Sequence, residues 1–438
     1  MNAYKLGVCE AERGIREGWL TPSQLLEDVL DRIESIEPKV GAWVTLDIDG
    51  ARRESERLTA EADEGEYRGP LHGIPVGVKD IFYTAGLRTT MGSPIYKDFV
   101  PLRDAESVSL LKGAGAFVLG KTETTEFALA DPARTRNPWN LEHTPGGSSS
   151  GSAAAVSSGM CPTALGSQTG GSVIRPASFC GIVGLKPTYG SISVEGVYPL
   201  SWSLDHVGFF TRTVEDCAIM LNVLRKEHEE TIALEPTQSP TLGLLTGYFR
   251  ENADRSVWEG HEEVLGKLQD AGATVREVQL PKVFKLVHAA HRVIMASEAA
   301  SAHEVNFKER FADYRINLKG LIASGQIVPA TTYMRAQRIR TLFMEETREM
   351  LKGLDCVVTP SAPTPALLGL DSTGDPAFNA PWSFCGFPAI TLPSGITKKG
   401  LPLGLQLVGV PYSEWGLLLH ASWCESVLDF DERPGDPS

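Results

Sequence analysis

Three polar side chains in this sequence could together carry out nucleophilic chemistry. Ser148 lies in the run GGSSSGS, Ser172 ends the run GSQTGGS, and Lys79 ends the alternating run LHGIPVGVK. A serine hydroxyl is a weak nucleophile at neutral pH and needs an adjacent base. A lysine can be that base only when burial or a neighbouring positive charge lowers its pKa. Lys79 follows apolar residues and glycines, so it is a candidate for such a base.

The residues just before Ser172 could stabilise a negatively charged intermediate. Thr169, Gly170 and Gly171 offer consecutive backbone N–H groups with little side-chain obstruction, which is what an oxyanion hole requires. Each feature alone has a simpler interpretation, because a lysine at a strand end is usually solvated and GGSSSGS is usually a turn or a helix start. The nucleophile elbow G-x-S-x-G at 147–151 lacks the preceding apolar strand. No Gly-Lys-Ser/Thr follows the glycines, so a P-loop is excluded.

The segment 146–190, which contains both serines, differs from the rest of the chain. It holds ten glycines, nine serines and only two charged residues, Arg175 and Lys186. Apolar runs at 153–156 and 182–185 interrupt it, and a flexible, solvated linker would not keep such runs. The segment therefore predicts buried backbone, with small residues where chain segments approach closely.

The elements that must position these residues alternate between strand and helix. Residues 21–24 (TPSQ) predict a helix start with a capping box, followed by an apolar stripe through residue 33. Lys79 ends a predicted strand over 71–79. A predicted helix over 104–115 precedes a short strand at 116–119.

The second half of the chain has a different pattern. Residues 255–350 are charge-rich and predict helices, without the glycine and serine bias. Strands are predicted at 356–360, 389–393 and 403–408, the last two as a hairpin. Residues 431–438 are expected to form a frayed tail.

The composition limits the class of protein. The 438 residues include 55 acidic and 41 basic residues, and the formal net charge of −14 disfavours binding to nucleic acid or to an anionic membrane. The N-terminal residues lack a signal-like apolar run, and no stretch is apolar enough to span a membrane. Seven widely spaced cysteines predict reduced thiols in a cytoplasmic protein. No HExxH motif occurs, so we expect no metal and no cofactor.

Several runs together are specific for one family. GGSSSGSAAAVSSG and GSQTGGSVIRPASFCGIVGLKPTYG resemble the signature sequence of the amidase signature family, and GPLHGIPVGVKD resembles its lysine segment. The 24-residue separation of Ser148 and Ser172 matches too, as do GKTETTEFA, SLDHVGFFTRTVEDCA, FCGFPAITLPSG and GLPLGLQLVG. The similarity spans roughly residues 20–425.

The resemblance implies a role for each matching residue. Ser172 would be the acylated nucleophile, neutral Lys79 the proton acceptor, and Ser148, on a cis peptide bond, the bridge between them. The backbone N–H groups of Thr169, Gly170, Gly171 and Ser172 would hold the oxyanion. The supporting residues would be Gly147, Gln168, Ser149, which braces the relay, and Arg175, which pins the nucleophile loop through carbonyl groups.

The chain departs from the family pattern at three positions. Gln168 replaces the common aspartate before Thr-Gly-Gly-Ser, Glu123 replaces the usual asparagine, and Ser150 replaces a glycine. These changes remove no catalytic group, but they weaken any transfer of substrate preference, particularly for glutamine. The expected substrate contacts are Met91, Thr124, Thr125, Phe127 and residues near Trp382. The alternative is that Phe127 and Trp382 are core aromatics.

The alternating elements predict an α/β fold. The resemblance adds the amidase signature fold, with a large mixed, twisted β-sheet flanked by helices on both faces. It implies a single domain over residues 1–438. The expected subdivisions are a signature core at about 71–220, a helical, specificity-determining subregion at about 230–350 and a C-terminal return to the core at about 354–425.

The function that the resemblance implies is hydrolysis of a C–N bond in a small amide, carbamate or urea-type substrate. The main interpretation is a stand-alone amidase, for which a homodimer is compatible with the sequence. The alternative is the glutaminase (A) subunit of a tRNA-dependent amidotransferase. Gln168 and the chain length favour the stand-alone enzyme. A catalytically silent scaffold is a third interpretation, which the intact Lys79, Ser148 and Ser172 argue against.

Overall fold

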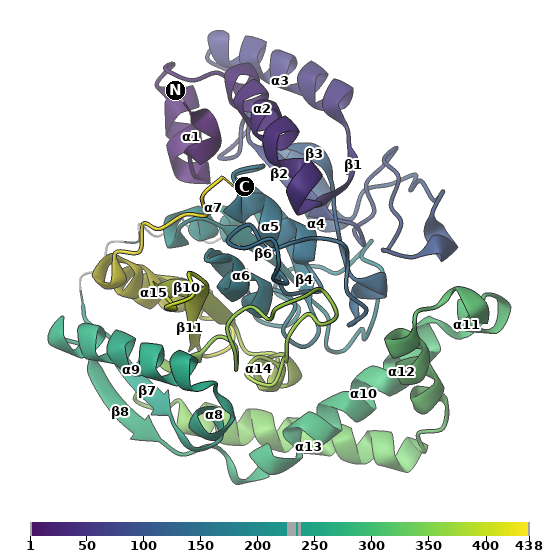
Figure 1. Cartoon of the computed structure of the whole chain (residues 1–438), viewed down its shortest axis with the longest axis vertical. Helices are drawn as coiled ribbons and strands as arrows, with labels where there is room; N and C mark the ends of the chain where they lie inside the picture. The colour runs from purple at the N-terminus through teal and green to yellow at the C-terminus, as the bar shows by residue number, and fades with distance from the viewer. Residues whose placement is uncertain (1, 226–233, 235–237, 437–438) are drawn as a thin grey trace.

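The computed structural model of the protein describes residues 2–225, 234 and 238–436. Its eleven described strands form one sheet in the order β1-β3-β2-β4-β6-β5-β10-β11-β9-β7-β8 (Figure 1). The strands are β1 Trp43–Leu46, β2 Pro75–Lys79, β3 Phe117–Thr122, β4 Thr163–Gln168, β5 Val183–Lys186, β6 His206–Thr211, β7 Thr241–Leu245, β8 Thr274–Val278, β9 Cys356–Pro360, β10 Ala389–Ile396 and β11 Pro402–Val408. The pairs β2/β3, β2/β4, β7/β8 and β7/β9 are parallel, and the other pairs are antiparallel. The predicted α/β class with a large mixed sheet is confirmed.

Helices flank both faces of this sheet. One face carries α5 and α6, which contact each other, and the other carries α7 and α15 (Figure 1). The α-helices are α1 Val8–Arg16, α2 Pro22–Val40, α3 Ile48–Asp63, α4 Glu106–Gly113, α5 Ser150–Ser157, α6 Ile174–Cys180, α7 Val214–Leu224, α8 Gly247–Asn252, α9 Arg255–Asp270, α10 Val287–Ala302, α11 Glu304–Glu309, α12 Ile316–Gln326, α13 Ala330–Met350, α14 Ala380–Cys385 and α15 Glu414–Leu428. Short 3₁₀ turns lie at Ala3–Lys5, Pro94–Tyr96, Glu126–Ala128, Lys282–Leu286 and Phe311–Asp313. Among the described helices, none has both the length and the apolar character that crossing a bilayer requires.

The helix start predicted from TPSQ is confirmed at α2. The Thr21 hydroxyl accepts a hydrogen bond from the Gln24 N–H at 3.1 Å, and the Gln24 side chain accepts one from the Thr21 N–H at 3.0 Å. This reciprocal capping box satisfies two N–H groups that the first helical turn would leave free. Gly41 ends the helix in a left-handed conformation with φ 66°, which a glycine adopts without steric cost.

The glycine- and serine-rich segment lies inside the protein, as its composition predicts. Every residue of α5 is buried except Ser157 at its end. Gly151 shows why the residues are small, because a Cβ atom there would lie 2.2 Å from the Ala42 carbonyl oxygen and 2.3 Å from the Glu123 nitrogen. Neighbouring backbone therefore passes where any larger side chain would begin.

Two strands lie where the sequence predicts only helices. β7 and β8 fall within the range 230–350, so this subregion is not wholly helical; residues 230–233 and 235–237 lie outside the described residues. β8 is the edge strand of the sheet, and its sequence TVREV exposes Arg276 and Glu277. Charged side chains protect a sheet edge from pairing with other chains. In this sequence they also make the strand resemble the charge-rich helices around it, so the pattern did not predict a strand.

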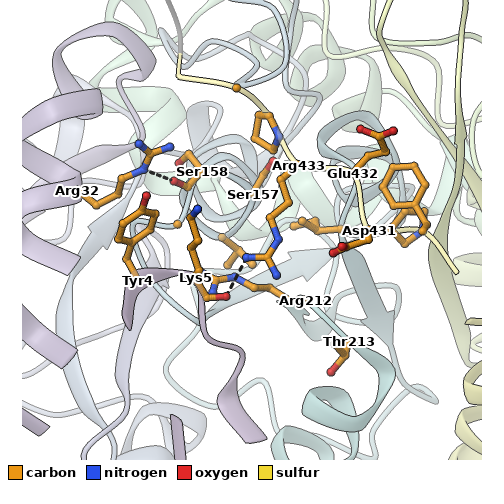
Figure 2. Close-up of a pocket in the computed structure, with 18 of the residues that line it drawn as sticks. Tyr4, Lys5, Arg32, Ser157, Ser158, Arg212, Thr213, Asp431, Glu432 and Arg433 are labelled. Atoms are coloured by element: carbon orange, nitrogen blue, oxygen red, sulfur yellow. Dashed lines mark hydrogen bonds between the residues drawn. The ribbon is translucent and has the colours of Figure 1, made fainter. Parts of the chain in front are cut away.

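The C-terminal segment is attached at Arg433 and Asp436, in contrast to the frayed tail predicted over 431–438, of which residues 437 and 438 lie outside the described residues. Arg433 donates a hydrogen bond to the Lys5 carbonyl oxygen at 2.9 Å, and Asp436 pairs with Arg32 at 2.5 Å. A cavity of about 440 Å³ lies between this segment and the N-terminal residues (Figure 2). Arg212 lines the same cavity beside Arg433.

The contact between α10 and α12 generates a stability prediction. A Cβ atom on Gly325 would lie 1.9 Å from the Ala296 carbonyl oxygen, so Gly325→Ala should destabilise the fold by about 1–3 kcal/mol through overpacking. Gly320 lies in the same helix and has no neighbouring atom within 4 Å of a built Cβ. Gly320→Ala should leave stability unchanged or raise it by up to ~1 kcal/mol. Thermal unfolding of the two variants tests this, and a loss of stability at both positions or at neither would contradict it.

Candidate active site

Lys79 lies at the C-terminal end of β2, with its amine buried between two serine hydroxyls. Its Nζ is 2.7 Å from the Ser148 Oγ and 2.7 Å from the Ser167 Oγ, and its side chain has no solvent exposure. Burial lowers the pKa of Lys79 well below the ordinary 10.5, although the Asp205 carboxylate opposes this. A neutral amine has two hydrogens and one lone pair, so it can donate to one serine and accept a proton from the other.

Ser148 and its neighbours are held where α5 begins. The peptide bond between Gly147 and Ser148 is cis. The Gly147 carbonyl accepts a hydrogen bond from Arg175 Nη2 at 2.6 Å, and Arg175 Nε donates to the Thr373 carbonyl at 2.7 Å. Ser149 Oγ lies 3.3 Å from both the carbonyl oxygen and the nitrogen of Ser167. The two segments that flank the Lys79 amine are therefore joined to each other.

The loop between β4 and α6 presents a row of unused N–H groups. Within the described part of the chain, the backbone N–H groups of residues 169–172 donate no hydrogen bond. Gln168 sets the shape of this loop, because its Oε1 accepts from the N–H groups of Val173 at 2.8 Å and Ile174 at 3.0 Å. Ser383 Oγ holds the other side by donating to the Gly170 carbonyl at 2.7 Å. A fixed loop with free N–H groups can bind an oxyanion.

Ser172 differs from the two other polar residues in its accessibility. Its exposed fraction is 8%, whereas Ser148 and Lys79 have none, so Ser172 is the one that a substrate could reach. Among the described residues, the hydrogen bonds do not include one between the hydroxyls of Ser148 and Ser172. The predicted bridge between these two hydroxyls therefore stays a prediction.

The predicted substrate contacts that are not aromatic are Met91, Thr124 and Thr125. Thr125 lies beside the Ser148 segment, since its N–H donates to the Ser148 carbonyl at 3.2 Å. Thr124 lies two residues after the end of β3. The Met91 carbonyl accepts a hydrogen bond from the Phe127 N–H at 2.8 Å.

Both predicted aromatic contacts are buried. Phe127 packs edge-on against His303 at 4.7 Å between ring centroids, and it stacks on Tyr314 at 5.7 Å. Trp382 is fully buried in a cluster with Phe249. The geometry thus supports the core-aromatic alternative for both.

Sequence reasoning missed Ser167 and gave no role to Asp205. Ser167 is hidden within the motif GSQTGGS, near the end of β4. Side-chain alternation along β4 would not have placed its hydroxyl beside Lys79, because Val78 is paired with Leu165 and Lys79 is therefore level with Gly166. Asp205 lies in the run SLDHVGFF, about 33 residues after Ser172, and only the fold brings it to Thr169.

Comparisons with known proteins agree on the family. The family model described as Amidase matches residues 24–418. The chain is 35% identical to the A subunit of the glutamyl-tRNA(Gln) amidotransferase of Syntrophus aciditrophicus over 99% of both chains. A solved structure described as an amidase superposes with a TM-score of 0.89 at 33% identity, covering 96% of this chain and 99% of that one. A structure from a study of the origins of an s-triazine catabolic enzyme gives a TM-score of 0.90 at 29% identity, covering 98% of this chain and 100% of that one.

Proposed function

Because the chain belongs to the amidase family, we propose that it hydrolyses a carbon–nitrogen bond through an acyl-enzyme intermediate on Ser172. The observation that carries this proposal is the distance of 2.7 Å between Lys79 Nζ and Ser148 Oγ, two side chains that have no solvent exposure. Burial lowers the pKa of the amine and so favours the uncharged form, which can act as a base for the neighbouring hydroxyl groups.

The proposed reaction has two halves. The Ser172 oxygen attacks the carbonyl carbon while its proton moves to Ser148, whose own proton moves to Lys79. The carbonyl oxygen becomes an oxyanion, which the N–H groups of residues 169–172 stabilise. As the intermediate collapses, the C–N bond breaks and Lys79 returns its proton through Ser148 to the leaving nitrogen. Water then attacks the acyl-enzyme and releases the acid, with the same residues moving the proton.

The first candidate substrate is the side-chain amide of glutamine, with the protein acting as one component of an amidotransferase. The match to the A subunit of such an enzyme over 99% of both chains supports this candidate more strongly than the stand-alone enzyme favoured by the sequence. It also implies partner proteins and a tRNA acceptor for the assembled enzyme, which the acidic composition alone argues against. The second candidate, a stand-alone amidase, is supported by the solved amidase at 33% identity and by Gln168 in place of aspartate.

Substrate choice separates these two candidates. As a glutaminase, the purified chain should release ammonia from glutamine with a higher kcat/KM than from acetamide, benzamide, a simple carbamate or a simple urea. Ammonia release from each compound, measured with the chain alone, tests this order. Turnover of the simple amides with no glutaminase activity would favour the stand-alone enzyme instead.

The nucleophile can be tested directly. Ser172→Ala should lower kcat by several orders of magnitude and abolish labelling by a fluorophosphonate probe, while the melting temperature stays near that of the wild type. Ser178→Ala is a matched control, because Ser178 is a buried serine on α6, six residues further along the chain. It should keep both activity and labelling. Retention of most activity in Ser172→Ala would place the nucleophile elsewhere.

The neutral lysine predicts the pH dependence of the reaction. The amine accepts a proton only when it is uncharged, so kcat/KM should fall as the pH drops through the Lys79 pKa and level off above it. Because burial lowers this pKa, the plateau should begin below pH 10.5, the ordinary lysine value. Initial rates between about pH 5 and pH 10 provide the measurement. A rate that does not rise with pH would contradict Lys79 as the base.

A further inference from the structure

Thr169, the first residue of the proposed oxyanion loop, is fixed on two sides. Its Oγ1 donates a hydrogen bond to Asp205 Oδ1 at 2.5 Å. Its carbonyl oxygen lies 2.9 Å from His291 Nε2, and since a carbonyl can only accept, Nε2 carries the hydrogen. The N–H group of Thr169 makes no hydrogen bond among the described residues, so the two contacts fix an N–H that stays available.

Asp205 is itself rigidly held. Its Oδ2 accepts hydrogen bonds from the N–H groups of Leu200 and Ser201, both at 2.9 Å. Burial raises the pKa of Asp205 to about 6, so the side chain is mainly a carboxylate at neutral pH. A carboxylate that accepts three hydrogen bonds has little freedom to move, and its contact to Thr169 is charge-assisted.

The helix α10 also supports the loop that carries Asp205, through the side chain of Glu298. Glu298 accepts hydrogen bonds from Ser201 Oγ at 2.6 Å and from Ser203 Oγ at 2.7 Å. Tyr333 on α13 donates to the same carboxylate at 2.8 Å. Glu298 lies seven residues after His291, so both side chains project from one face of α10. A continuous chain of hydrogen bonds thus joins α13 and α10 to Thr169.

From these contacts we infer that Asp205 is a positioning residue for the oxyanion site. It acts through the Thr169 hydroxyl to hold the Thr169 N–H in place, and α10 supports it through Glu298 and holds Thr169 directly through His291. The inference rests on the proposed function, since it assigns a purpose to the loop that precedes Ser172. An oxyanion donor stabilises the transition state only when it is oriented before the charge develops.

A double-mutant cycle tests whether Asp205 acts through Thr169. Asp205→Ala and Thr169→Val should each lower kcat by about 10-fold to 100-fold with KM changed by less than about twofold. The double variant should be no slower than the slower single variant, because both changes break the same contact. Multiplicative losses in the double variant, or an unchanged kcat in both single variants, would overturn the inference. Thr169→Val preserves the side-chain volume, so it remains informative if Asp205→Ala does not fold.

Two further variants separate positioning from stability. Asp205→Asn should restore most of the lost kcat, because its amide oxygen can accept from Leu200 and Ser201 while its NH₂ group donates to Thr169. Asp216 is a matched control, as a buried carboxylate that accepts from the Cys9 N–H at 2.8 Å. Asp216→Ala should lower the melting temperature but leave kcat unchanged. Failure of Asp205→Asn to restore kcat, or an equal kcat loss in Asp216→Ala, would make Asp205 merely structural.

Fluorophosphonate labelling distinguishes this inference from the proposed function. If Ser172→Ala keeps its activity and its labelling, the proposed function itself fails. If Ser172→Ala is inactive but Asp205→Ala and Thr169→Val turn over at the wild-type rate, only the positioning role fails.

Discussion

The site depends on the Lys79 amine, which is buried away from solvent. Lys79 can share hydrogens with Ser148 and Ser167 only because β2 lies between β3 and β4 and no solvent reaches the end of the strand. Desolvation disfavours the charged form of such a group. The same burial requires neighbours that fill the space and still supply hydrogen-bond partners. Glycine and serine meet both needs, which accounts for the unusual composition around residues 146–190.

Local patterns predicted the parts of the fold that local sequence determines. The capping box at Thr21, the strand that ends at Lys79 and the buried glycine-rich segment could each be inferred from a few neighbouring residues. The edge strand β8 could not be inferred, because the charged residues that protect a sheet edge are also typical of an exposed helix. Trp382 could not be placed either, since an aromatic residue looks the same in sequence whether it lies in a core or in a pocket wall.

The residues of the site likewise divide into those that the sequence identifies and those that it does not. Lys79, Ser148 and Ser172 could be selected by residue type, spacing and family resemblance. Ser167 and Asp205 could not, because their contacts depend on which strands become neighbours. β4 and β6 are antiparallel partners, and this pairing brings Asp205, just before β6, beside Thr169, just after β4. Contacts of this kind are set by topology and leave no periodic signal in the sequence.

The contact between residues 3–5 and the segment 431–436 has a consequence for how the protein opens locally. Residues 3–5 and 431–436 contact one another through Arg433 and the Lys5 carbonyl, far along the chain from β2, β4 and β6. This hydrogen bond joins residues 428 positions apart in the chain, so local opening of residues 3–5 would also release residues 431–436.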